Sequence, residues 1–104
     1  MSLSLQVLYP TDNGSTFDHD YYMSKHMEVV ANSIRGHIER VTVTKGIAGG
    51  PNVPAGYHAI ATILFADKAA MDAAMASVGP AVADIANFYN GTPQMLIGEV
   101  VAAT

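Results

Sequence analysis

Alternation of hydrophobic and polar residues predicts four β-strands. Near the N-terminus, Leu3, Leu5 and Val7 alternate with polar residues, and this first strand ends at Pro10. Further strands are expected over residues 37–48, 57–65 and 95–101. The first of these three contains a β-branched run, whereas the other two are apolar at both odd and even positions. Apolar residues at both parities are typical of a strand that is buried on both faces.

Helical spacing predicts a first helix over residues 17–34. Apolar side chains recur on one face of it, at Met23, Met27, Val30 and Ile34. The opposite face should be exposed to solvent, and it carries Tyr21, Lys25, Glu28 and Asn32. Ser15 and Asp18 have the spacing of a capping box at the start of this helix, and Gly36 is a plausible terminator.

A second helical region follows Asp67, which is a suitable N-cap. Its apolar stripe consists of Met71, Ala74, Met75 and Val78. Gly79 and Pro80 interrupt it, and Pro80 can start a further short helix that extends to about Phe88.

The resulting order, β-α-β-β-α-β, predicts an α+β fold of the ferredoxin-like type with a four-stranded antiparallel sheet. We expect residues 1–104 to form one domain. Two helical regions cover only one face of such a sheet, yet the strands are apolar on both sides. The pattern therefore predicts that a second copy covers the open face, in a homodimer.

Composition narrows the possible functions. Half of the 104 residues are hydrophobic and only 13% are charged, so the chain is expected to be ordered. A net charge of −4 with five Lys and Arg argues against nucleic-acid binding. The lack of cysteine excludes disulfides, thiol catalysis and thiolate metal sites. No apolar run approaches the length of a membrane span, and the first residues lack signal-peptide features, so a cytoplasmic location is expected.

The most distinctive segment reads Phe17-Asp18-His19-Asp20-Tyr21-Tyr22-Met23-Ser24-Lys25-His26-Met27, in which an aromatic residue and an acid precede a Tyr pair and a His-Met. This segment resembles that of the EthD family, the ethyl tert-butyl ether degradation proteins. Weaker matches follow in order along the chain at Gly46, Tyr57 with Phe65, Asp84 with Asn87 and Phe88, and Gly98 with Glu99. Glu28 departs from the family pattern, which often has a proline there, but it lies on the predicted solvent side.

The resemblance implies a dimeric α/β barrel, in which two ferredoxin-like protomers pack sheet to sheet and each holds a pocket between its sheet and helices. Proteins of that architecture include cofactor-free monooxygenases, polyketide cyclases, muconolactone isomerases and some haem enzymes. EthD-type proteins themselves look like participants in, or accessories to, the oxidative degradation of small organic compounds. We therefore expect no cofactor, with haem as an alternative that would need His26 or His58 as its axial ligand.

Three residues are candidates for chemistry. His26 and Tyr22 lie one turn apart at the edge of the apolar stripe, where His26 could act as a general acid or base and Tyr22 as a donor to a developing oxyanion. The alternative is a packed histidine that bonds a backbone carbonyl. Asp84 stands in an apolar helix, where it could be a perturbed acid or base, an orienter for His26, or simply locally capped or exposed. The expected pocket walls are Met27, Ile63, Phe65 and Phe88.

The remaining histidines do not form a motif. His19 should lie about 10 Å from His26 by helix rise, and His58 should point into an apolar layer of the sheet. No ligand spacing typical of a metal site is present, and His37 is expected to be exposed.

Two classes of function remain open. One is an enzyme, such as a cofactor-free oxygenase, cyclase or isomerase, that acts by proton transfer or oxygenation on a small apolar or aromatic compound. The other is a non-catalytic binding or accessory protein that uses the same pocket.

Overall fold

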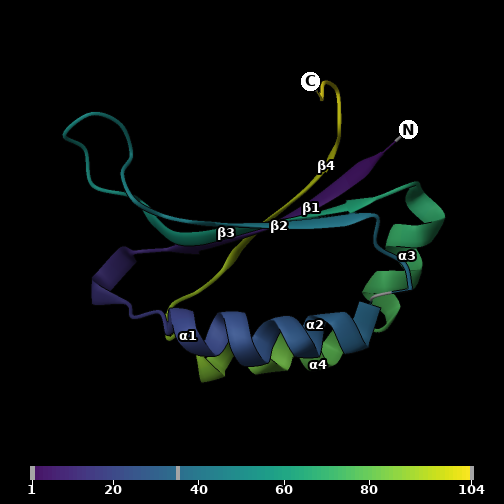
Figure 1. The fold of residues 1–104 in the computed structure, drawn as a ribbon, viewed down its shortest axis with the longest axis horizontal. Coiled ribbons are helices and arrows are strands. Elements are labelled where there is room, and N and C mark those ends of the chain that lie inside the picture. The colour runs from purple at the N-terminus through teal and green to yellow at the C-terminus, as the bar shows by residue number, and fades with distance from the viewer. Residues whose placement is uncertain (1, 35, 104) are drawn as a thin grey trace.

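The computed structural model describes residues 2–34 and 36–103, which form a sheet covered on one side by helices (Figure 1). Within these residues the four antiparallel strands have the order β2-β3-β1-β4. They are β1 (Leu3–Pro10), β2 (Arg40–Lys45), β3 (Tyr57–Phe65) and β4 (Gln94–Glu99). The predicted ferredoxin-like fold is confirmed.

The helical layer is made of two parts that are far apart in the sequence. The first comprises α1 (His19–Tyr21), a π-helical turn η2 (Tyr22–His26) and α2 (Met27–Ile34). The second comprises α3 (Lys68–Ala76), α4 (Gly79–Asp84) and the 3₁₀ turn η3 (Ile85–Asn87). A short 3₁₀ turn, η1 (Asp12–Gly14), follows β1. In Figure 1, α1 and α2 follow one another along one continuous helix beneath the sheet, and α4 packs against α2.

The two helix starts differ in how well the sequence identified them. Asp67 caps α3 as predicted, because its Oδ1 accepts the Ala70 N–H at 2.8 Å. At α1 the cap is Asp18, whose Oδ1 accepts the Tyr21 N–H at 3.0 Å. Ser15 does not cap this helix; its hydroxyl lies 3.0 Å from the Pro10 carbonyl oxygen, to which it donates. The first helix therefore begins at the acid rather than at the serine.

The core lies between the sheet and the helices. On β1 and β3 every second side chain is buried there, namely Leu5, Val7, Tyr9, Ala59, Ala61, Ile63 and Phe65. The intervening residues, such as Leu8, Ile60 and Leu64, face the other side of the sheet and are half-buried. Figure 1 shows that the loop of residues 46–56 and the chain after β4 both rise on this open side. Burial on both faces is thus not achieved by one copy of the chain.

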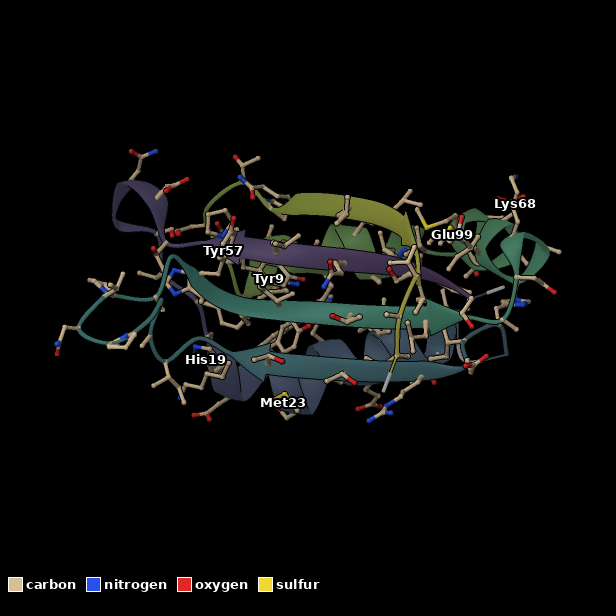
Figure 2. The ribbon with its side chains drawn as sticks, turned by 90° about the horizontal axis from the view of Figure 1, so that it is seen from above. Tyr9, His19, Met23, Tyr57, Lys68 and Glu99 are labelled. Carbon is tan, nitrogen blue, oxygen red and sulfur yellow. The ribbon has the colours of Figure 1, made fainter. Side chains whose placement is uncertain are left out.

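The π-helical turn changes which face of the first helix is buried. Its wider turn keeps residues at four-residue spacing aligned, whereas an ideal α-helix would rotate them steadily around the axis. The buried side chains are accordingly Tyr22, His26, Val30 and Ile34. The predicted stripe is wrong at Met23, which is 59% exposed and lies at the outer edge of the molecule beyond β2 (Figure 2). Figure 2 looks onto the open face of the sheet with the helices behind it.

Candidate functional site

The centre of the site is a histidine–carboxylate pair that joins the two parts of the helical layer. His26 Nδ1 and Asp84 Oδ2 are 2.8 Å apart, and the two side chains are only 5% and 11% exposed. His26 comes from η2 and Asp84 from the last residue of α4. Because ionised Asp84 can only accept, Nδ1 carries the proton and the neutral ring has its lone pair on Nε2.

Two further donors hold the other oxygen of the carboxylate. The Tyr21 hydroxyl donates to Asp84 Oδ1 at 2.7 Å, and the Asn87 side-chain amide donates to the same oxygen at 2.9 Å. Asp84 therefore accepts three hydrogen bonds. Tyr21 was expected to face solvent, but it is half-buried; the π-helical turn begins directly after it and brings it to the same carboxylate as His26.

An apolar cavity lies in front of the histidine. Nearly all of its lining is hydrophobic, and its polar side chains are Tyr9, Tyr22 and His26. Its volume is about 50 Å³, which is more than a single water needs. Met27 and Met75 are among its walls. Because methionine side chains adapt easily, these walls can give way to a larger apolar ligand.

His26 presents its free nitrogen to this cavity. Nε2 of His26 has no hydrogen bond to any described residue. In residues 2–34 and 36–103, every fully enclosed side-chain nitrogen or oxygen does have a partner, so Nε2 is not fully enclosed. Nε2 must therefore border open space, and the space that His26 lines is the cavity. Behind the ring, Phe88 packs with its centroid 4.5 Å from that of the imidazole. The ring is thus fixed by packing on one side and by Asp84 at Nδ1.

Two phenols line the cavity together with the histidine, Tyr22 beside His26 and Tyr9 beside Tyr22. The rings of Tyr22 and His26 are 5.1 Å apart between centroids, and those of Tyr9 and Tyr22 are 5.8 Å apart. Burial raises the pKa of Tyr22 to about 12, and burial together with the neighbouring Tyr22 raises the pKa of Tyr9 above its usual range. Both hydroxyls are therefore neutral at physiological pH. A neutral phenol keeps its proton, so the Tyr22 hydroxyl can donate a hydrogen bond to a ligand in the cavity.

The ionisation of the pair follows from its surroundings. Burial lowers the pKa of His26 below its usual value, even though the carboxylate of Asp84 acts in the opposite direction. Burial acts to raise the pKa of Asp84, but the hydrogen bonds from Tyr21, Asn87 and His26 outweigh it, and the pKa lies below the usual range. At neutral pH the pair is therefore a neutral imidazole and an ionised carboxylate.

Of the four residues expected to form the pocket walls, two line the cavity and two do not. Met27 and Ile63 line the cavity. Phe65 is fully buried under the helices and Phe88 packs on His26, and neither lines the cavity. The structure does not place these two expected walls at the cavity, because the ring of Phe65 is enclosed in the core and that of Phe88 packs on His26.

The other histidines lie away from the cavity. His58 is re-aimed by a register shift between β1 and β3: its Nε2 is 3.0 Å from the Ser15 hydroxyl, and its ring stacks on Phe17 at 5.7 Å. His19 packs on the same Phe17 ring at 4.6 Å. His37 is exposed, as predicted. A β-bulge of this kind rotates side chains out of strict alternation, so His58 does not enter the layer expected for it.

Sequence reasoning missed two residues of the site. Tyr21 was assigned to the solvent side, and no pattern in the sequence announces a π-helical turn. Tyr9 carried a usable signal, because it continues the alternation of Leu5 and Val7 and so belongs to the buried face of β1. Asn87 was not missed, because the family resemblance already paired it with Asp84; it stands three residues after Asp84, a helical spacing that brings two side chains together.

The described residues offer few possible ligands to a metal ion or a haem. In the two described stretches no group of three or more His, Asp or Glu side chains could hold a metal ion. His26 lines the cavity of about 50 Å³, and its Nε2 is the nitrogen left for a ligand there. His58 has its Nε2 committed to Ser15 and does not line the cavity.

Comparison with known proteins gives the class of protein. The family model of the EthD domain matches residues 14–92. An EthD-like protein of Ralstonia eutropha JMP134 is 31% identical, with a TM-score of 0.87 over 99% of this chain and 95% of that chain. The chain belongs to the EthD family, as the segment of residues 17–27 indicated. No curated protein sequence matches it.

More distant structures share the fold. An EthD-family protein of Bacillus halodurans C-125 is 20% identical, with a TM-score of 0.62 over 95% of this chain and 98% of that chain. SnoaB, a cofactor-independent oxygenase of Streptomyces nogalater, is 10% identical, with a TM-score of 0.65 over 98% of this chain and 95% of that chain.

None of the helices in residues 2–34 and 36–103 is long and apolar enough to cross a membrane.

Proposed function

We propose that this EthD-family protein is a cofactor-independent enzyme that takes a proton from a small, mostly apolar, enolisable or phenolic compound. The observation that carries the proposal is the pairing of His26 with Asp84 at the edge of an apolar cavity. A neutral imidazole whose second nitrogen faces such a cavity is suited to act as a general base. The cofactor-independent oxygenase with the same fold supports the idea that this architecture can work without a bound group.

Each polar group then has a distinct role. Nε2 of His26 accepts the proton from a C–H or O–H acid, and ionised Asp84 stabilises the imidazolium that forms. The Tyr22 hydroxyl donates to the oxygen on which negative charge develops, and the apolar walls strengthen that hydrogen bond. The resulting carbanion or phenolate is the reactive species for rearrangement, cyclisation or reaction with molecular oxygen.

The functional unit of this proposal is a homodimer with the two sheets face to face. Half-buried Leu8, Ile60 and Leu64 lie on the open face of one copy, and Leu96 there is 56% exposed. The loop of residues 46–56 and the chain after β4 rise on the same side (Figure 1) and carry Ile47 and Val101, which are 91% and 88% exposed. An apolar face with apolar arms at its rim fits a second copy of the same surface.

A second candidate is a non-catalytic protein that binds or delivers a small compound in a degradation pathway. The observation that favours it is the nearly complete hydrophobic lining of the cavity, which can hold an apolar molecule by shape alone.

The identity of the ligand decides between these candidates. Native mass spectrometry of the purified protein, followed by extraction and identification of whatever is bound, names a compound to test. Under the enzyme proposal, the wild-type protein converts this compound or its precursor, and Tyr22→Phe slows turnover less than His26→Ala does. Binding that survives in both variants, with no turnover by any form, supports the binding protein and contradicts the enzyme.

A further inference from the structure

We propose that Tyr21 and Asn87 are positioning residues that select the tautomer of the neutral His26 ring. Both donate to Oδ1 of Asp84, so that Oδ2 is left for Nδ1 of the histidine. Neither residue lines the cavity. The inference rests on the proposed function, because it concerns how His26 is held ready as a base.

The argument starts from the capacity of a carboxylate. Ionised Asp84 has acceptor sites on both oxygens, and without other partners either oxygen could face the imidazole. Two donors on Oδ1 fix the plane of the carboxyl group, and they also favour its ionised form. An ionised Oδ2 at 2.8 Å accepts only from a protonated Nδ1. The neutral ring is therefore the tautomer whose lone pair is on Nε2, toward the cavity.

The positions of the donors explain why these two residues are suited to the task. Tyr21 immediately precedes η2, the same turn that delivers His26, and Asn87 belongs to η3, which continues α4 beyond Asp84. The backbone N–H of Asp18 donates to the Phe88 carbonyl at 2.8 Å and ties the two segments together. The two hydrogen bonds to Oδ1 of Asp84 thus come one from each of the two helical parts that meet at the site.

The substitution Asp84→Asn gives a test that separates positioning from mere packing. The introduced amide must offer its oxygen to the two donors at the Oδ1 position, so its NH₂ group faces Nδ1 of His26. Nδ1 then has to accept, and the proton of the neutral ring moves to Nε2. We expect turnover to fall on the order of 10³–10⁴-fold, the size of the effect when a catalytic histidine is held in the wrong tautomer.

Removing the donors in this background should reverse the effect. In the triple variant Asp84→Asn/Tyr21→Phe/Asn87→Ala the amide is free to rotate, so its oxygen can face Nδ1 and the proton can return there. We expect the Nδ1–H tautomer to reappear and turnover to rise at least about 10-fold over Asp84→Asn alone, since one hydrogen bond to a charged or reacting group is worth about that factor. A purely structural role predicts further loss instead.

The tautomer is measured directly from the ¹⁵N chemical shifts of the imidazole nitrogens, with His26→Gln used to assign the His26 signals. Asp84→Asn/Tyr57→Phe is the matched control, because Tyr57 also loses a hydroxyl that bonds a side-chain oxygen, but that oxygen belongs to Gln94 and not to residue 84. If the triple variant does not fold, Asp84→Asn/Tyr21→Phe is compared with this control. A return of the His26 proton to Nδ1 in the former alone supports the proposal.

Two results would overturn the inference. One is an Asp84→Asn protein that keeps the proton on Nδ1, because the amide oxygen would then face His26 and not the donors Tyr21 and Asn87. The other is a triple variant that folds but keeps the proton on Nε2. The NMR readout needs no substrate, so it separates the two proposals. If the tautomers change as expected while His26→Ala turns over a genuine substrate normally, positioning holds and the proposed function fails.

Discussion

On β3, Ile60 and Ile63 are the same residue type three positions apart, and they lie on opposite faces of the sheet. Ile63 is 6% exposed, packs under the helices and lines the cavity, whereas Ile60 is half-buried on the open face. The helix-covered face also holds His26, Tyr22 and Tyr9. The comparison teaches that one copy of the chain completes one face, and that face contains the candidate chemistry. The other face offers hydrophobic surface without a comparable set of buried polar groups.

A charge on the open face should have the largest effect. In a face-to-face dimer Ile60→Lys places two lysines in one apolar interface, because a two-fold axis repeats every substitution. We expect the dimer to dissociate, since unpaired charges at such an interface cost several kcal/mol. Sedimentation or light scattering at micromolar concentration measures the mass. Ala83→Lys, on the exposed side of α4, is the control and should remain a dimer. A wild-type protein of monomeric mass would show that the open face has no such role.

Removal of the proposed base, His26, should have the second largest effect, and it should change turnover without changing the dimer. His26→Ala is expected to lower turnover by about 10²–10⁴-fold, which is the typical contribution of a general base. The mass of the assembly should not change. His37→Ala removes an exposed histidine and should leave both properties at wild-type values. Turnover of an identified substrate at the wild-type rate by His26→Ala would refute the assignment.

A matched pair of truncations compares the two faces directly. Ile63→Ala should lower the free energy of unfolding by about 2–5 kcal/mol, because the site is enclosed by a single chain. Ile60→Ala should cost less per chain, and its cost should depend on protein concentration if a second copy covers it. Urea denaturation at two protein concentrations measures both effects. Equal, concentration-independent losses would mean that the two faces are equally complete within one chain.

Acidification should have the smallest effect. The pKa of folded His26 lies below its usual value of 6.5, so between these two values the unfolded chain binds a proton that the folded chain does not. Stability should therefore fall as the pH decreases below about 6.5, by at most about 1.4 kcal/mol per pH unit from this group. The loss stops growing once the pH has passed below the lowered pKa.

The variant His26→Gln should show a shallower dependence of the urea midpoint on pH between 7.5 and 5.5. His19, whose pKa is also lowered by burial, contributes in the same direction in both proteins and so cancels in the comparison. The depressed pKa of Asp84 acts only below its usual value of 3.8, outside this range. An unchanged slope would show that His26 binds its proton equally well in the folded and unfolded chain.

Much of the architecture follows from local sequence. The alternation on β1 and β3, the cap at Asp67 and the break at Gly79–Pro80 each depend on residues close together in the chain, and each predicted element exists. The structure explains why position 46 is a glycine: a side chain there would collide with the Tyr57 carbonyl where β2 leads into the loop. Local patterns suffice for such features because strand pleat, helix period and caps are set within a few residues.

The sequence by itself determined the element order and the family, and it indicated His26, Tyr22 and Asp84 as candidate site residues. Only the tertiary structure decided that Tyr21 turns inward and Met23 outward, because a π-helical turn in η2 shifts the buried face and leaves no mark in the hydrophobic pattern. It also decided that Asp84 meets His26 across 58 positions of sequence, and that His58 turns toward Ser15 at a register shift. Such contacts depend on how separate elements pack, and no spacing within one element encodes them.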